Sequence, residues 1–145
     1  MEFFLVEISL KESDIEETAI PGCELFTLPH ASFCWAPSSK LVDIQTQARW
    51  TVFLWGSANF VDEMASRQDV TAKIVDELNR TGSLKSVLAK LEGGFGVIAW
   101  NEQTRELQFA TDPIGMTRMY YSVRDGKIII SSHAQLIARK REDFT

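Results

Sequence analysis

The hydrophobic pattern divides the chain into two runs of strands with a helical stretch between them. Residues 3–10 are apolar, with polar side chains spaced two apart, which is the period of a β-strand. Residues 49–55 (RWTVFLW) and 95–100 are largely apolar on both faces, which predicts strands covered on each side. The other predicted strands cover residues 25–28, 32–35, 41–44, 106–111, 119–124 and 127–132.

Helical periodicity occupies the middle of the chain. Between residues 61 and 78 apolar side chains recur at intervals of three and four, which predicts an amphipathic helix broken once along its length. Asp69 is placed to cap its second part, and Ser83 to cap a further helix over residues 84–91. Residues 134–139 predict a closing helical turn.

Glycines mark the ends of several of these elements. Gly82 suits the left-handed conformation that follows the carboxyl end of a helix. Asp125 and Gly126 predict a type I′ hairpin turn, in which both positions have positive φ. Strands, then helices, then strands again, without a regular βαβ alternation, predict an α+β fold with antiparallel sheets.

Length and charge narrow the class of protein. A chain of 145 residues fits one domain, taken as residues 1–145. The net charge of -5 disfavours a nucleic-acid module, because phosphate contacts need a face rich in Lys and Arg. The basic run at residues 139–141 is interpreted as a solvated tail. An acidic cluster near the start is interpreted as a solvated edge and loop: Glu2, Glu7, Glu12, Asp14, Glu16 and Glu17.

Targeting and metal chemistry leave little trace in the sequence. No apolar run approaches the ~20 residues of a membrane helix, and the first residues are acidic where a signal peptide needs basic ones. A cytoplasmic protein that binds no membrane is therefore predicted. Cys23, Cys34, His30 and His133 lack the spacing of a zinc site, so no metal site is expected. Both cysteines are interpreted as small buried hydrophobic residues.

The most specific pattern covers residues 91–137. A Leu-x-Gly-x-Phe strand is followed by a tryptophan with a polar turn, an Asp-Pro-x-Gly loop, a Tyr-Tyr pair and a serine-rich strand. The residues are Leu91, Gly93, Phe95, Trp100, Asn101, Asp112, Pro113, Gly115, Tyr120, Tyr121, Ser131 and Ser132. Their order resembles the end of the amino-terminal glutaminase domain of asparagine synthetases and related class II glutamine amidotransferases.

The resemblance implies a fold and a set of functional positions. The fold is that of N-terminal-nucleophile hydrolases, a four-layer αββα sandwich of two antiparallel sheets between helical layers. The family's nucleophile is a Cys at the amino terminus whose own α-amino group acts as the base. Glu2 stands at that place here, and Trp55 and Gly56 stand where the family has Asn-Gly for oxyanion stabilisation. Asp69 matches either the aspartate that holds the substrate's amino group or a helix cap.

The remaining motif residues are interpreted as structural from their own residue types. Gly93, Asp112, Pro113 and Gly115 are expected to shape close packing and a turn, with Asp112 holding backbone amides. The family's Arg-Gly-Pro-Asp loop has no counterpart between residues 10 and 33.

Three other kinds of chemistry are weaker alternatives. Cleavage after Gly22 would unmask Cys23 as a nucleophile, but only 33 positions then separate it from Gly56, too few for the family's strands. Ser132 with His133 suggests a hydrolase triad, without the Gly-x-Ser-x-Gly elbow. The glycines at 93, 94 and 96 suggest a phosphate loop, but they precede a strand rather than open a helix.

The leading prediction is therefore a degenerate, catalytically silent glutaminase-like domain. It would have a structural or regulatory role beside an ATP-dependent amide- or lactam-forming synthetase, as in the similar β-lactam synthetases and lasso-peptide cyclases. The expected partner is an ATP-pyrophosphatase synthetase domain or subunit, with a homodimer also considered. No cofactor is expected in this domain, and ATP and Mg are expected only on the partner. The alternatives are a small enzyme with different amide chemistry in the same cavity and a plain interaction module.

Overall fold

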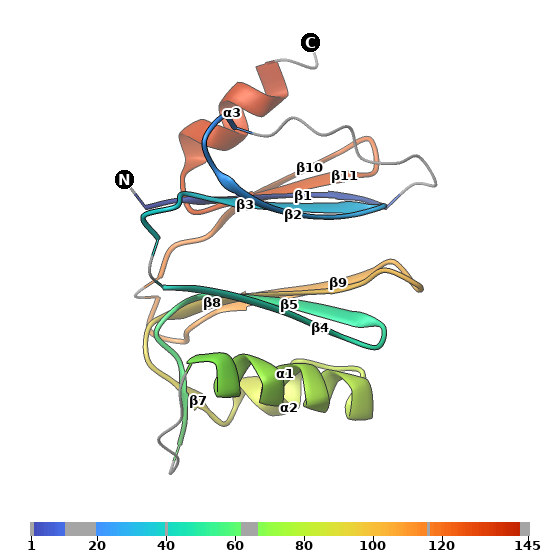
Figure 1. Ribbon diagram of the computed structural model, residues 1–145, viewed down its shortest axis with the longest axis vertical. Coiled ribbons are helices and arrows are strands. Elements are labelled where there is room, and N and C mark those ends of the chain that lie inside the picture. The colour runs from blue at the N-terminus through green and yellow to red at the C-terminus, as the bar shows by residue number, and fades with distance from the viewer. Residues whose placement is uncertain (1, 11–19, 40, 62–66, 116, 143–145) are drawn as a thin grey trace. The chain divides into compact units, whose positions relative to one another are not determined.

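The computed structural model describes residues 2–10, 20–39, 41–61, 67–115 and 117–142 (Figure 1). The chain divides into two compact units. The first contains residues 1–40 and 119–145, and the second contains residues 41–118. Both units combine antiparallel sheets with helices, so the predicted α+β class is confirmed. The four-layer sandwich of the N-terminal-nucleophile fold stays a prediction.

The first unit is a five-stranded antiparallel sheet in the order β10-β11-β1-β3-β2, with helix α3 against β10 and β11 (Figure 1). Its elements are β1 (Phe4–Ser9), β2 (Glu24–Leu28), β3 (Ala31–Trp35), β10 (Tyr120–Arg124), β11 (Lys127–Ser131) and α3 (Ala134–Glu142). All six residues of β1 are buried, as expected for a strand with a neighbour on each side. Asp125 and Gly126 have φ values of 52° and 76°, which confirms the predicted hairpin turn.

The second unit is a four-stranded antiparallel sheet in the order β4-β5-β8-β9, with α1 and α2 lying along one face (Figure 1). Its strands are β4 (Val42–Gln47), β5 (Trp50–Gly56), β8 (Phe95–Asn101) and β9 (Glu106–Thr111). Its helices are α1 (Arg67–Thr81) and α2 (Lys85–Leu88). A separate two-stranded ladder joins β6 (Asn59–Phe60) to β7 (Leu91–Glu92).

One hydrophobic cluster joins the helices of the second unit to its central strands. The apolar positions of α1 point into it at intervals of three and four, as the sequence predicts. Its members are Trp50, Val52, Leu54, Ala58, Phe60, Val70, Ile74, Val75, Leu78, Leu84, Val87, Leu91, Phe95, Val97 and Ala99.

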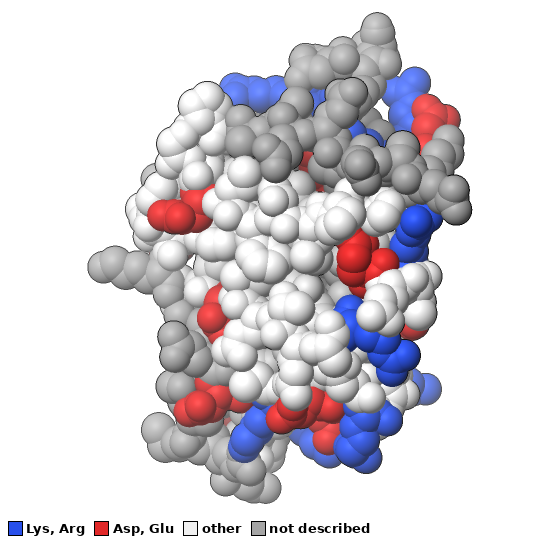
Figure 2. Space-filling view, turned by 45° about the vertical axis from the view of Figure 1, so that its right-hand side comes forward, with Lys and Arg blue, Asp and Glu red and all other residues white. Residues whose placement is uncertain are grey.

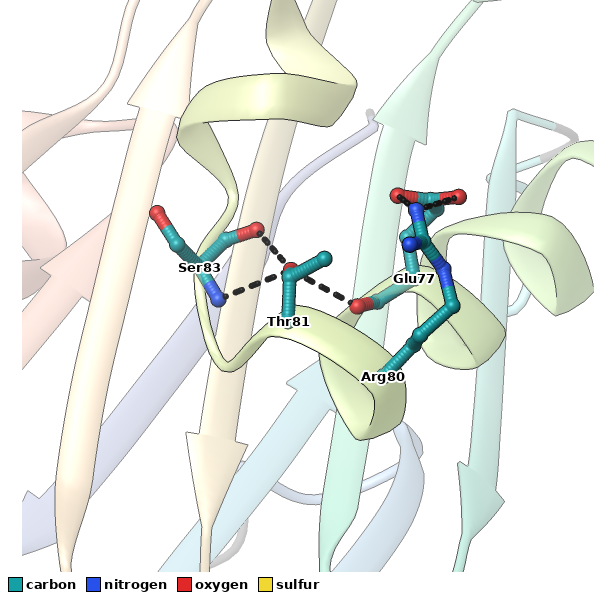
Figure 3. Close-up of polar contacts among 4 residues, drawn as sticks. All are labelled: Glu77, Arg80, Thr81 and Ser83. Atoms are coloured by element: carbon teal, nitrogen blue, oxygen red, sulfur yellow. Dashed lines mark hydrogen bonds and ion pairs between the residues drawn. The ribbon is translucent and has the colours of Figure 1, made fainter.

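Polar groups at the carboxyl end of α1 end the helix locally (Figure 3). Gly82 has a φ of 75°, and its N–H bonds to the carbonyl of Leu78 at 2.8 Å, which confirms the predicted helix stop. The hydroxyl of Thr81 donates to the carbonyl of Glu77 at 2.8 Å and accepts the N–H of Ser83 at 3.3 Å. These bonds satisfy backbone groups that a helix end leaves without partners inside the helix.

Several predicted boundaries are wrong. Val61 lies in a turn, residues 62–66 are outside the described residues, and α1 begins at Arg67. Asp69 therefore lies inside the first turn of α1 rather than before it, and a carboxylate in the first turn interacts favourably with the helix dipole. The helix predicted for residues 84–91 is the single turn α2, and its last residues form a turn and the start of β7.

Two charged residues interpreted as solvated are in fact buried. Glu7 in β1 is 4% exposed and Lys140 in α3 is 8% exposed. The Nζ atom of Lys140 lies 2.8 Å from Oε1 of Glu7, and Nζ of Lys127 lies 3.5 Å from Oε2. The pair thus ties α3 to the middle strand of its sheet. The other acidic residues of the predicted cluster, apart from exposed Glu2, lie outside the described residues.

No helix among the described residues is both long enough and apolar enough to cross a membrane.

Candidate functional site

At the end of β5 the backbone lies close to the segment that precedes β8. Gly56, the last residue of β5, has a φ of 97°, and its N–H bonds to the carbonyl of Leu41 at 2.8 Å. The N–H of Ser57 bonds to the carbonyl of Gly94 at 2.8 Å. A Cβ on Gly56 would lie 2.5 Å from that same carbonyl oxygen, and a Cβ on Gly93 would overlap the carbonyl of Ser57. Glycine is therefore required at both places by backbone crowding.

Asp112 supports strand β8, which begins beside this close approach of the backbone. Its carboxyl is buried, with 3% of the residue exposed, and Oδ1 accepts the N–H of Phe95 at 3.2 Å and of Thr117 at 3.1 Å. Its own N–H bonds to the carbonyl of Phe95 at 2.9 Å. Gly115, with a φ of 75°, donates its N–H to the carbonyl of Asp112 at 3.1 Å. One side chain therefore joins the first residue of β8 to the loop after β9.

Replacing Asp112 should lower stability in two graded steps. Asp112→Ala leaves two backbone N–H groups without this acceptor, so we expect a loss of about 2 to 3 kcal/mol in the free energy of unfolding. Asp112→Asn keeps an oxygen acceptor without the charge and should cost about half as much. Chemical denaturation measures both values. Equal losses for the two variants would show that the charge, rather than the acceptor, carries the effect.

The positions predicted to form a degenerate pocket belong to different parts of the structure. Trp55 is half-buried in β5, where it pairs with Val42 and Gly96. Asp69 is exposed on α1, and Glu2 is exposed directly before β1 in the other unit. A pocket shared by Glu2 and Trp55 stays a prediction.

Two cavities in the second unit involve none of these positions. The larger, of about 520 Å³, lies between α2 and β9 and is lined mainly by apolar side chains such as Leu84, Leu88 and Leu107. Its wall is held by Gln108, whose side chain bonds to the N–H of Leu84 and the carbonyl of Gly82, each at 2.8 Å. Sequence patterns gave no signal for this cavity, because its walls come from segments distant in the chain.

The smaller cavity, of about 370 Å³, lies against the polar face of α1. Lys73 lies 5.3 Å from the ring centre of Phe60, and Arg80 bonds to both carboxylate oxygens of Glu77 at 2.7 Å (Figure 3). The hydrogen bond lowers the pKa of Glu77 and raises that of Arg80. Acidic and basic side chains are intermingled over this helical layer (Figure 2), so the cavity is not a uniformly cationic anion site.

Metal binding finds no support in the described ranges, where no group of three His, Cys, Asp or Glu side chains is placed to hold an ion.

Comparison with protein families gives the relationship of the chain. The family model for a glutamine amidotransferase domain matches residues 60–139, more than half of the sequence. The chain belongs to this family. The match includes Asp69, Gly93, Asp112, Pro113 and Gly115, and it begins after Trp55 and Gly56. No curated protein matches the chain significantly.

The described residues at the start of β1 include no thiol. Glu2 and Phe3 precede β1, and neither side chain can form the thioester that releases ammonia. Cys34 in β3 is 4% exposed, and burial, together with the neighbouring Cys23, raises the pKa of its thiol to about 11. A thiol with such a pKa is almost entirely protonated near neutral pH and is a poor nucleophile.

Cys23 lies beside an edge strand rather than beside the middle strand of its sheet. It directly precedes β2, an edge strand, whereas β1 lies between β11 and β3. Cleavage before Cys23 would remove β1 and with it the pairing partner of two strands.

Ser132 and His133 are used to anchor β1. The hydroxyl of Ser132 lies 2.8 Å from Nδ1 of His133 and accepts the N–H of Phe4 at 2.9 Å. The hydroxyl of Ser131 donates to the carbonyl of Phe4 at 2.7 Å. These contacts fix the start of β1 against the end of β11, and the described residues place no carboxylate on His133 to complete a triad.

Proposed function

We propose that this chain is a catalytically silent glutamine amidotransferase-like domain of the asparagine synthetase type. The observation that carries the proposal is the start of β1: the resemblance to asparagine synthetases implies a Cys there, and the described residues that precede the strand are Glu2, which is exposed, and Phe3. Trp55, which the resemblance matches to the family's oxyanion asparagine, also supports the proposal, because its side chain has no amide group. Losing a nucleophile alone already costs many orders of magnitude in rate.

The retained family positions fit a scaffold rather than a catalyst. Gly56 and Gly93 allow two backbone segments to approach closely, and Asp112 accepts the N–H of Phe95 at the start of β8. These features preserve the fold of the second unit without any reacting group. We therefore assign the domain a structural or regulatory role beside an ATP-dependent amide- or lactam-forming synthetase, which would hold the ATP and Mg.

Purified protein should release no ammonia from glutamine above the buffer blank. The reason is that no described thiol is both exposed and placed at the start of the sheet's middle strand. The assay should run beside an active glutaminase as a positive control. A glutamine analogue bearing a diazoketone provides a second readout, because it alkylates a competent nucleophile and raises the intact mass.

Two variants locate any activity that does appear. If Cys23→Ser abolishes turnover or labelling, Cys23 exposed by cleavage after Gly22 is the nucleophile. If Ser132→Ala abolishes turnover, the Ser132 and His133 pair is responsible. Either result would overturn the silent assignment. The partner is tested separately by isolating the tagged chain from its own cells, where an ATP-pyrophosphatase synthetase should be recovered in stoichiometric amount.

A further inference from the structure

Strand β2 is a sheet edge rich in large apolar residues. β2 ends the five-stranded sheet on one side, and its residues Leu25, Phe26 and Leu28 are large and apolar. Leu25 is 39% exposed. Sheet edges in natural proteins are normally protected by charged residues, proline or bulges. Glu24 is the only charged residue in β2, and it lies at the first position.

The register of the sheet fixes which backbone groups of β2 point outward. The N–H of Ala36 bonds to the carbonyl of Phe3, and the N–H of Ser9 to the carbonyl of His30, so even-numbered positions of this segment bond to β1. In an antiparallel ladder the odd-numbered positions of β3 then bond to β2. Their partners in β2 are Glu24, Phe26 and Leu28.

The N–H and C=O groups of Leu25 and Thr27 consequently face away from the sheet. No other backbone group among the described residues bonds to either of them. Two outward residues separated by one inward residue form the pattern that a second antiparallel strand needs.

We propose that β2 pairs with β2 of a second copy of this chain, antiparallel about a two-fold axis at Phe26. In this register Leu25 of each copy lies opposite Thr27 of the other, and the two residues exchange both backbone hydrogen bonds. Four hydrogen bonds then join the two five-stranded sheets into a single ten-stranded sheet. A two-fold axis makes the same surface serve both copies, which closes the assembly at a dimer.

The side chains are compatible with this register. Phe26 lies opposite its own copy at a non-hydrogen-bonded pair, where cross-strand side chains are closest. It already packs edge to face on Phe33, with ring centres 6.1 Å apart, so the aromatic contact would continue across the axis. Glu24 would lie opposite Leu28, and no like charges would face each other. The other edge strand, β10, ends in Arg124 beside Asp125 and serves as the comparison.

Proline substitutions at the two edges test the surface. Thr27→Pro removes an N–H that makes no hydrogen bond within the sheet. Val123→Pro is the matched change on β10, because the register there also directs the N–H of Val123 away from the sheet. Small strand-edge interfaces are weak, so the measurement needs a high protein concentration. At roughly 100 μM, sedimentation equilibrium should find the unsubstituted protein dimeric. Thr27→Pro should raise the dissociation constant roughly 10- to 100-fold through two lost hydrogen bonds, and Val123→Pro should leave it unchanged.

Cysteine pairs test the register without relying on proline. In a Cys23→Ser background, Leu25→Cys and Thr27→Cys lie opposite each other across the axis, within reach of a disulfide. Each variant alone places its two cysteines two positions apart, beyond disulfide range. Oxidation should therefore cross-link the mixture of the two variants and neither variant alone.

Each outcome decides the proposal. A monomeric parent at this concentration, a Thr27→Pro variant that is folded by circular dichroism and still dimeric, or a dimer lost only in Val123→Pro would overturn it. Failure of the mixed cysteines to cross-link, even if Thr27→Pro does not fold, would also overturn it. None of these readouts depends on glutaminase activity, so the proposed function stands or falls separately.

Discussion

Replacing Lys140 with Met should destabilise the protein by about 3 kcal/mol. Lys140 is 8% exposed and its Nζ lies 2.8 Å from Oε1 of Glu7, which is 4% exposed. Breaking a buried ion pair by removing one partner typically costs about 3 to 5 kcal/mol, because the remaining charge stays buried. We expect the lower end because Nζ of Lys127 still lies 3.5 Å from Oε2. Denaturant titration measures the loss.

Two further variants separate the charge effect from helix packing. Arg139→Met changes an exposed neighbour on α3 and should shift stability by less than about 0.5 kcal/mol. Glu7→Leu combined with Lys140→Met removes both charges and should recover most of the loss, since an apolar pair of similar volume is often as stable as a buried ion pair. A Lys140→Met protein within 1 kcal/mol of the parent would mean that water reaches the pair.

The strands could be predicted because their signals are local. Period-two patterns, the Asp125-Gly126 turn and the glycine after α1 each depend on a few neighbouring residues, and all three occur in the structure. The ladder between β6 and β7 escaped prediction because each strand has only two residues, too few to show a period. The sequence predicted helix α1 but placed its start too early, at Val61. Val61 continues the helical spacing of apolar residues, although it lies in a turn.

Burial of Glu7 and Lys140 could not be predicted because the partners lie at opposite ends of the sequence. Within α3, Lys140 stands between two other basic residues, and residue type alone does not tell which of the three turns toward the sheet. The run of charge at residues 139–141 was therefore interpreted as a solvated tail. Only the pairing of β1 with β11, which brings α3 over β1, reveals the ion pair.

The residues of the candidate site also differ in whether local sequence is enough to assign their roles. Gly93 and Asp112 are within the matched family region, and their structural roles follow from contacts within one unit. Glu2 and Trp55 precede the matched region, so their assignment rests on position relative to β1 and β5. Residue chemistry shows which side chains stand at the start of a strand, but not which side chains line a pocket. The two cavities of the second unit likewise arise from packing that the sequence does not display.

Replacing Phe95 with Ala should lower the free energy of unfolding by about 3 to 5 kcal/mol, as expected for a large side chain deleted from a packed core. Phe95 is 0% exposed, opens β8 opposite Gly56, and belongs to the cluster that joins the central strands to α1 and α2. Its backbone is already held by Asp112, so the start of β8 cannot shift freely to fill the cavity. Denaturant titration of both proteins gives the difference.

Phe109→Ala is the matched control for this prediction. Phe109 lies on the edge strand β9 of the same sheet and is only partly buried, so its deletion removes less contact and should cost clearly less than that of Phe95. A loss under 1 kcal/mol for Phe95→Ala would place the start of β8 outside the core. Equal losses for the two variants would show that the cluster does not depend on the strand that carries the family's Gly-x-Phe motif, and the scaffold role assigned to that motif would then lose its physical basis.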